Sequence, residues 1–431
     1  MHTIEIFVLV LSFVVLLGIG VPVAWSIGLS TLFTMLVSIP AMPAVSTIAQ
    51  RMATGLDSFT LLAIPLFILA GEIMNRGGIA RRLVDFSKTL VGSLPGGLAH
   101  INIIAAMLMG AIAGSAVAAV SGIGGVLGPR MDKEGYPKGF SAAVNITAGT
   151  TGLIIPPSNV LIVYSLASGG VSIAALFLAG YLPGILMGLL LMTVAYVWAR
   201  RYRIPTGERS SLREAARAFV HAFPSLLLLV VVIGGIIGGL FTATEASAVA
   251  VLYTLVLVAI YREVTWAGLR DILLKACETT AIVAVLIGAS MAMSWVMSYA
   301  DIPRNVAEAL LALSENKYVV LLIINLILLA VGVFMDMTPA VLIFTPIFLP
   351  VVRDLGVDPI HFGIIMVLNL CIGLCTPPVG SVLFVGVSVA GTTIQAVLRP
   401  MIPLFGAMLV ALVLVTLFPS LSLWLPRLLG M

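Results

Sequence analysis

The chain has 431 residues, of which 61% are hydrophobic and only 9% are charged. Soluble domains average about 25% charged residues, so this composition excludes a soluble globular fold and indicates a polytopic helical membrane protein. The net charge of +4 does not point to nucleic acid, because basic residues in this class gather in cytoplasmic loops.

Apolar segments predict ten membrane crossings. A spanning helix needs about 20 predominantly apolar residues, and segments of this kind follow one another from the first residues to the last. They fall at about 4–20, 22–39, 58–75, 138–167, 173–199, 220–241, 244–261, 277–298, 357–388 and 392–418. The first segment lacks a basic region before it, so we expect a retained span and not a signal peptide.

Two further apolar stretches, at about 98–129 and 318–351, are too long for one helix and have polar, Gly- or Pro-containing centres. We expect each to be a re-entrant hairpin, which enters the membrane and leaves it on the same side. An amphipathic stretch precedes each hairpin, at 79–94 and 302–313. Both suit helices that lie along the membrane surface, although ordinary solvated loops would explain the same pattern.

Two of the crossings contain adjacent prolines, Pro156-Pro157 in the first and Pro377-Pro378 in the second. Proline lacks a backbone N–H and clashes with the preceding helical turn, so each pair is expected to break its helix. Unpaired backbone groups are costly in lipid, and such breaks survive only where they are buried or line a cavity. Broken helices in corresponding places of two halves are typical of transporter binding sites.

The two halves of the chain align. Gly110 matches Gly332 at a shift of 222, and the proline pairs match at a shift of 221. Five crossings separate the two hairpins, so the second half is inverted relative to the first. We therefore predict scaffold helices at 1–57, a first repeat at 58–200, a cytoplasmic loop with scaffold helices at 201–276, and a second, inverted repeat at 277–431.

The distribution of basic residues predicts the orientation. With a periplasmic N-terminus, 16 of the 22 Lys and Arg residues fall on the cytoplasmic side, as expected from the bias of cytoplasmic loops toward positive charge. The predicted fold class is therefore an all-α polytopic membrane protein. It is an inverted-repeat transporter with two re-entrant hairpins and two broken helices.

The hairpin centres and the helix breaks hold the polar groups expected at a transport site. Asp336, at the centre of the second hairpin, suits a sodium ion, a helix N-terminus or backbone N–H groups, or it caps the turn. Small residues around Gly114 and Ser115 favour either close helix packing or a polar tip. Glu72, near the end of a span, is expected at the membrane interface.

Unwound carbonyls and hydroxyls at the breaks are hard oxygen ligands suited to Na⁺, and the helix N-termini that follow them suit a carboxylate. Such groups belong to Thr150, Thr151, Gly152, Ser158 and Asn159 in the first break and to Cys375, Thr376, Gly380 and Ser381 in the second. The sequence contains no nucleophile–base pair, no metal-ligand spacing and no P-loop, so we expect neither an enzyme nor an ATP-driven pump.

Several motifs resemble the large membrane subunit of TRAP (tripartite ATP-independent periplasmic) transporters, the DctM family. They are GVFMDMTPA from Gly332, PIFLP from Pro346, VDPIHFGIIM from Val357, GLCTPPVG from Gly373 and, earlier in the chain, AGSAVA from Ala113, GY from Gly135, IIPPS from Ile154 and FTATEA from Phe241. The resemblance runs nearly end to end and implies a sodium-driven importer of the bacterial inner membrane that works as an elevator.

This resemblance also implies partners and cargo. The family works with a small four-helix membrane subunit and a periplasmic substrate-binding protein, and sodium ions are its only expected cofactors. Its substrates are mostly organic acids: C4-dicarboxylates, sialic acids, sugar acids and keto acids. The alternative is a stand-alone ion-coupled anion carrier or exchanger of the same architecture, which would need no binding protein.

By motif match, the resemblance places sodium sites between the hairpin tips and the helix breaks. The sodium candidates are Gly114, Ser115, Thr150, Gly152, Gly332, Asp336 and Thr376. The substrate-binding candidates, at the two breaks, are Ser158, Asn159, Thr376, Gly380 and Ser381. Two positions depart from the usual pattern of the family, Ser121-Gly122 and Asn159, so the resemblance leaves the identity of the ligand open.

Overall fold

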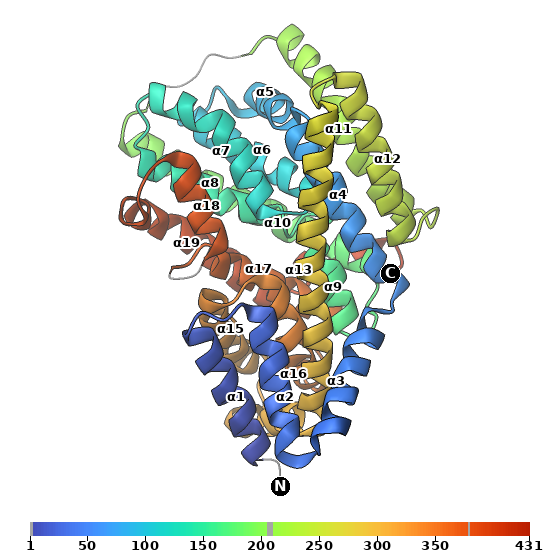
Figure 1. Ribbon diagram of the computed structural model, residues 1–431. Coiled ribbons are helices and arrows are strands. Elements are labelled where there is room, and N and C mark those ends of the chain that lie inside the picture. Colours follow the sequence, from blue (N-terminus) through green and yellow to red (C-terminus); the bar gives the residue numbers. More distant parts are fainter. Residues whose placement is uncertain (1–2, 205–209, 378–379) are drawn as a thin grey trace.

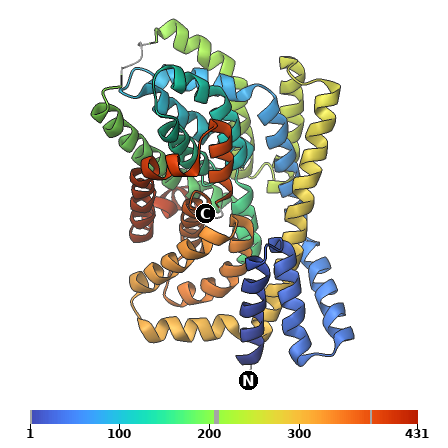
Figure 2. The same cartoon turned by 60° about the vertical axis from the view of Figure 1, so that its left-hand side comes forward.

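The computed structural model describes residues 3–204, 210–377 and 380–431, and every regular element within them is a helix (Figures 1 and 2). Eight helices of this described part are long and apolar enough to cross a membrane. The predicted all-α fold is therefore confirmed. The second proline of the second break, Pro378, lies outside the described residues.

The chain begins with a group of helices that includes one missed by the sequence prediction. Its elements are α1 (Thr3–Gly18), α2 (Val23–Ser38), α3 (Ala41–Leu56), η1 (Phe59–Leu62) and α4 (Ala63–Arg76). Helix α3 was not expected, because its polar residues interrupt any apolar run. It packs against the long helix α13 (Trp266–Tyr299), and the Arg51 guanidinium lies 5.1 Å from the centre of the Trp295 ring.

Both predicted hairpins are present, and each follows a short amphipathic helix. The first hairpin is α6 (Gly97–Ala113) and α7 (Ala116–Lys133) after α5 (Ile79–Val91), and the second is α15 (Lys317–Phe334) and α16 (Met337–Asp354) after α14 (Ile302–Leu313). The loop alternative for the two amphipathic stretches is therefore wrong. Figure 1 places α5, α6 and α7 in the upper half of the molecule and α15 and α16 in the lower half.

Both predicted broken helices are also present. The first consists of α8 (Lys138–Thr151) and α9 (Asn159–Ala167), and the second of α17 (Pro359–Leu374) and α18 (Ser381–Ala390). The helical backbone stops before each pair of prolines and starts again after it, as expected where two consecutive N–H donors are missing. The first interruption is buried from Gly152 to Ser158, where other groups can cover the free backbone.

The remaining helices are α10 (Ile173–Arg201), α11 (Leu212–Ile237), α12 (Ala243–Tyr261), α19 (Ile394–Leu417) and α20 (Ser420–Leu428). Two helices extend beyond their apolar segments: α11 begins at Leu212 instead of 220, and α13 at Trp266 instead of 277. Each has a side-chain cap at its true start, for example the Thr265 hydroxyl that accepts from the Gly268 N–H at 3.2 Å. Helix α20 was not expected.

The internal repeat appears as matching contacts between the hairpins and the broken helices. In the first half α6 crosses α8 glycine on glycine, and a Cβ built on Gly110 would lie only 2.6 Å from Gly152 Cα. In the second half a Cβ built on Gly373 would lie 2.6 Å from Gly332 Cα. These are equivalent positions of the two halves, so both halves use one packing arrangement.

The two broken helices contact each other near the middle of the molecule. The Cys371 thiol donates a hydrogen bond of 3.3 Å to the Thr150 carbonyl. The two residues are separated by 221 positions, which is the shift that relates the halves. The broken helices therefore meet at equivalent residues, as expected for two units related by a pseudo-two-fold axis.

A second contact joins the halves, and it gives a testable prediction. The fully buried Tyr164 hydroxyl of α9 donates to the Pro359 carbonyl of α17 at 2.6 Å. We expect Tyr164→Phe to destabilise the protein by about 0.5–1.5 kcal/mol, because it removes a buried hydrogen bond between the two halves. Thermal unfolding in detergent measures this as a lowered melting temperature. Tyr202→Phe, at a tyrosine that is 60% exposed, is the control, and equal melting of the two variants would contradict the prediction.

Candidate functional site

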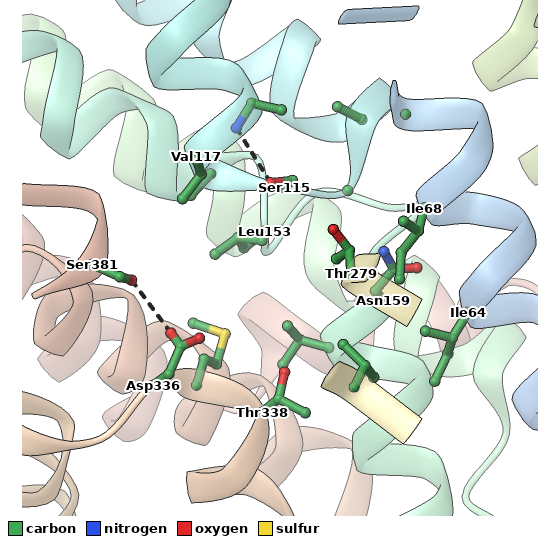
Figure 3. Close-up of a pocket in the computed structure, with 18 of the residues that line it drawn as sticks. Ile64, Ile68, Ser115, Val117, Leu153, Asn159, Thr279, Asp336, Thr338 and Ser381 are labelled. Atoms are coloured by element: carbon green, nitrogen blue, oxygen red, sulfur yellow. Dashed lines mark hydrogen bonds between the residues drawn. The ribbon is translucent and has the colours of Figure 1, made fainter. Parts of the chain in front are cut away.

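A cavity of about 210 Å³ lies where the two hairpin tips and the two helix breaks meet (Figure 3). The first hairpin contributes Gly114 to Ala118, and the second contributes Asp336 to Thr338. The remaining wall comes from α4 and α13. The lining from the breaks is Leu153, Asn159, Val160, Leu374, Ser381 and Val382.

Four helices begin at this cavity. The first residue of each helix belongs to the cavity lining: Ala116 of α7, Asn159 of α9, Met337 of α16 and Ser381 of α18. A helix N-terminus carries free N–H groups and a partial positive charge of about +0.5. No Lys or Arg lies among the described residues that line the cavity. The groups there that can attract an anion are therefore backbone N–H groups, and they lie in the same cavity as the carboxyl groups of Glu72 and Asp336.

Asp336 is the acidic group at the second tip. It precedes the first residue of α16, but its side chain makes no capping hydrogen bond in that helix. Its Oδ1 instead accepts a hydrogen bond of 3.4 Å from the Ser381 hydroxyl, across the gap between tip and break (Figure 3). The carboxylate lines the cavity, where a cation could reach it.

The first tip is built from a tight turn. Gly114 has φ of +60°, a conformation that favours glycine, and Ser115 caps α7 by accepting from the Ala118 N–H at 3.3 Å. A Cβ on Gly114 would lie 3.3 Å from Asn159 Nδ2, so the tip rests on the first break. The buried Asn159 Oδ1 has no hydrogen-bond partner within the described structure.

The structure brings together some of the predicted site residues and sets others behind them. Gly114, Ser115, Asn159, Asp336 and Ser381 line the cavity. The other six candidates do not: Ser158, Thr150, Gly152, Gly332, Thr376 and Gly380.

Four of these six residues have contacts that account for their positions, whereas the buried Ser158 hydroxyl has no hydrogen-bond partner within the described structure. The Thr150 hydroxyl donates to the Thr147 carbonyl at 2.9 Å, and the Thr376 hydroxyl donates to the Ile372 carbonyl at 2.8 Å. Gly152 and Gly332 form the helix crossings described above. The structure therefore separates the candidates that face the cavity from those that support its walls, and their role in ion binding stays a prediction.

Sequence reasoning missed three polar residues of the lining: Glu72, Thr279 and Thr338. Glu72 was expected at the membrane interface, but it faces the cavity from α4. A signal was available, because Glu72 follows Ile64 and Ile68 at helical spacing of four and so shares their face. Thr279 comes from α13, and no local pattern indicates that this helix passes the cavity.

Comparison with known proteins identifies the family. The sequence model described as "Tripartite ATP-independent periplasmic transporter, DctM component" matches residues 10–421. The chain belongs to the DctM family. It is therefore a multi-pass membrane protein of the TRAP transporter type, and the resemblance inferred from its motifs is confirmed.

Several DctM-family relatives match over nearly their whole length. The chain is 59% identical to the uncharacterized protein YgiK of Salmonella typhimurium, over 98% of this chain and 97% of that protein. It is 42% identical to the C4-dicarboxylate TRAP transporter large permease DctM of Pseudomonas aeruginosa, over 94% and 95% of the two chains. It is 39% identical to the 2,3-diketo-L-gulonate TRAP transporter large permease YiaN of Escherichia coli, also over 94% and 95%.

A solved structure shares the fold of this DctM-family chain. The crystal structure of the Alcanivorax borkumensis YdaH transporter, described as having an unusual topology, matches with a TM-score of 0.63. The match covers 91% of this chain and 90% of that one, at 15% sequence identity. This likeness concerns the fold alone.

Proposed function

We propose that the chain is the large permease subunit of a sodium-driven TRAP transporter that imports an organic acid by an elevator mechanism. One observation carries the proposal: four helix N-termini and the Asp336 carboxylate meet at one cavity between the two halves. Named relatives carry C4-dicarboxylates and 2,3-diketo-L-gulonate, both of which are organic anions. Since such relatives are transport permeases, we infer that this chain is not an enzyme.

Sodium is the proposed coupling ion, and no other cofactor is required. Asp336 provides a carboxylate at the second tip, and the open carbonyls and hydroxyls of both tips are hard oxygen ligands of the type that Na⁺ accepts. The proposed sodium residues are those predicted from the sequence, of which Gly114, Ser115 and Asp336 face the cavity. Sodium bound there would offset the negative charge of Asp336 and allow a carboxylate to bind beside it.

In the proposed mechanism, the two hairpins and two broken helices move together as the transport domain. The other spans and the amphipathic helices α5 and α14 form the scaffold. Sodium binds first and orders the contacts between tips and breaks, and the carboxylate then binds at the helix N-termini. The loaded domain slides across, whereas a partly loaded one would expose charge to lipid. A ligand shifts this equilibrium only by its difference in affinity for the two positions.

The proposed partners are a small four-helix membrane subunit and a periplasmic substrate-binding protein. The proposed location is the bacterial inner membrane, with a periplasmic N-terminus. A relative named as an isethionate permease DctMQ is matched over 96% of this chain but only 65% of its own length. The rest of that relative's length lies outside the match.

The sodium proposal predicts the outcome of a reconstitution experiment. The permease and its small subunit are placed in liposomes, with the binding protein and labelled succinate, D-glucuronate or N-acetylneuraminate outside. Replacing the inward sodium gradient by choline should lower uptake roughly tenfold or more, since each tenfold gradient of a coupled ion contributes about 1.4 kcal/mol. Uptake that is unchanged without sodium, at a clamped pH gradient, would contradict sodium coupling. Uptake without the binding protein would favour the stand-alone carrier.

A further inference from the structure

The side of the cavity formed by α4, α9 and α13 presents hydrogen-bond acceptors. Glu72 of α4 contributes a half-buried carboxylate, and Asn159 of α9 contributes an amide oxygen that is buried and lacks a partner. Figure 3 shows Asn159 beside Thr279 of α13, with Ile68 of α4 next to them. A buried acceptor without a partner is costly, so this side requires a ligand that donates hydrogen bonds.

The negative charge of Glu72 is not cancelled by an ion pair within the described structure. Arg76 and Lys275 lie close enough to attract the Glu72 carboxylate, but each forms its ion pair elsewhere: Arg76 pairs with Asp271 at 3.6 Å, and Lys275 pairs with Glu278 at 3.0 Å. Neither Arg76 nor Lys275 lines the cavity. A carboxylate of the cargo placed on this side would therefore meet the like charge of Glu72, which the two basic residues offset only in part.

The side of the cavity at the second tip and the second break offers hydrogen-bond donors beside one carboxylate. There the N-termini of α16 and α18 supply N–H groups and Ser381 supplies a hydroxyl, while the start of α7 lies beside Asn159. Asp336 lies on this side and is the proposed sodium ligand. One carboxylate of the cargo is therefore accommodated here, and a second one has no favourable place in a cavity of about 210 Å³.

We propose that the cargo is a polyhydroxylated monocarboxylate of the sugar-acid class, and that Glu72 and Asn159 determine this specificity. The cargo's hydroxyls donate to the Glu72 carboxylate and to Asn159 Oδ1, while its single carboxylate lies at the helix N-termini. Thr279 and Thr338 line the same space with hydroxyls of their own. This inference rests on the proposed function, because it assumes that the cavity is the transport site for an organic acid.

Binding to the permease alone tests the inference, because the binding protein then adds no selectivity of its own. The purified large and small subunits are melted in sodium buffer with increasing D-glucuronate, D-gluconate, succinate or L-malate. The hydroxylated monocarboxylates should stabilise the complex at roughly tenfold lower concentration than the dicarboxylates, a ratio typical of one hydrogen bond to a charged group. Equal or stronger stabilisation by the dicarboxylates overturns the inference and leaves the organic-acid function intact.

Glu72→Gln separates the charge from the shape of the side chain. The variant should bind D-glucuronate roughly tenfold more weakly and succinate more strongly, so that its preference narrows or reverses. Glu315→Gln is the matched control, because Glu315 is exposed and lies outside the lining. If Glu72→Gln keeps the wild-type preference for D-glucuronate over succinate, the role of Glu72 is overturned. If the variant does not fold, the melting series of the wild type with the four acids still decides the cargo class. If no acid stabilises the complex and none is taken up by the complete system, the proposed function fails as well.

Discussion

Asp336→Ala is expected to lower sodium-driven uptake about 100-fold or more while the protein still folds. Asp336 is the acidic side chain at the junction of the second tip and the second break, where Ser381 is its hydrogen-bond partner. In the proposed mechanism Asp336 and sodium form a charge pair that the loaded transport domain shields from water, and removing one member of such a pair costs about 2–5 kcal/mol, a loss of about 30-fold to 1000-fold in affinity. Under that proposal the variant would not hold sodium and could not keep the cargo's carboxylate beside the helix N-termini.

Two measurements test this prediction. Uptake into liposomes gives the size of the loss, and the melting temperature with and without sodium shows whether the ion still stabilises the protein. Asp336→Ala should melt at the same temperature in sodium and in choline, whereas the wild type should melt higher in sodium. Asp354→Ala is the control, because Asp354 is exposed at the opposite end of the same helix. If Asp336→Ala shows full uptake, Asp336 is not a sodium ligand and its role is only structural.

Gly152→Ala is expected to damage transport nearly as much, for a different reason. The added Cβ would collide with the backbone of Gly110, and a backbone atom cannot move aside as a flexible side chain can. Hairpin and broken helix must then separate, and overpacking of this kind costs about 1–3 kcal/mol. A displacement of about 1 Å in a binding site can cost 100-fold in rate. We therefore expect uptake to fall by about that factor.

The melting temperature in choline distinguishes packing from ion binding at Gly152. A packing defect lowers the melting temperature even without sodium, whereas the loss of an ion ligand lowers it only when sodium is present. Gly125→Ala is the control, since a Cβ at Gly125 on α7 would meet no atom within 4 Å. That variant should be neutral or slightly stabilised, because alanine favours helix more than glycine does. If Gly152→Ala behaves like Gly125→Ala, the close crossing of the two helices is unimportant.

The sequence predicted those features that depend on local chemistry. Adjacent prolines break a helix wherever they occur, so both breaks and their positions could be read from the chain. The polar centres at Gly114 and Asp336 likewise marked the hairpin turns. Helices α3 and α20 were missed, because the one is interrupted by polar residues and the other is short. Both depend on packing against helices that are distant in the sequence.

The site was predicted only in part, because facing a cavity is a property of the tertiary arrangement. Thr150 and Thr376 have the residue type of a sodium ligand, but their hydroxyls bond to carbonyls of their own helices. Glu72 and Thr279 lie far from every break in the sequence, and only the approach of α4 and α13 brings them to the cavity. Motifs therefore located the region, and the packing of the helices decided which residues reach it.

The four helix ends at the cavity have a consequence for how such a transporter can change its cargo. In the proposed function, a carboxylate is attracted there by the main chain, which no side-chain replacement removes. Substitutions at a few positions such as Glu72 and Asn159 can then change which chemical groups the cargo must carry besides its carboxylate. Affinity for organic acids in general then depends on the main chain, whereas selectivity among organic acids depends on side chains. Such a scaffold can acquire new nutrients by small mutational steps without passing through an inactive ancestor.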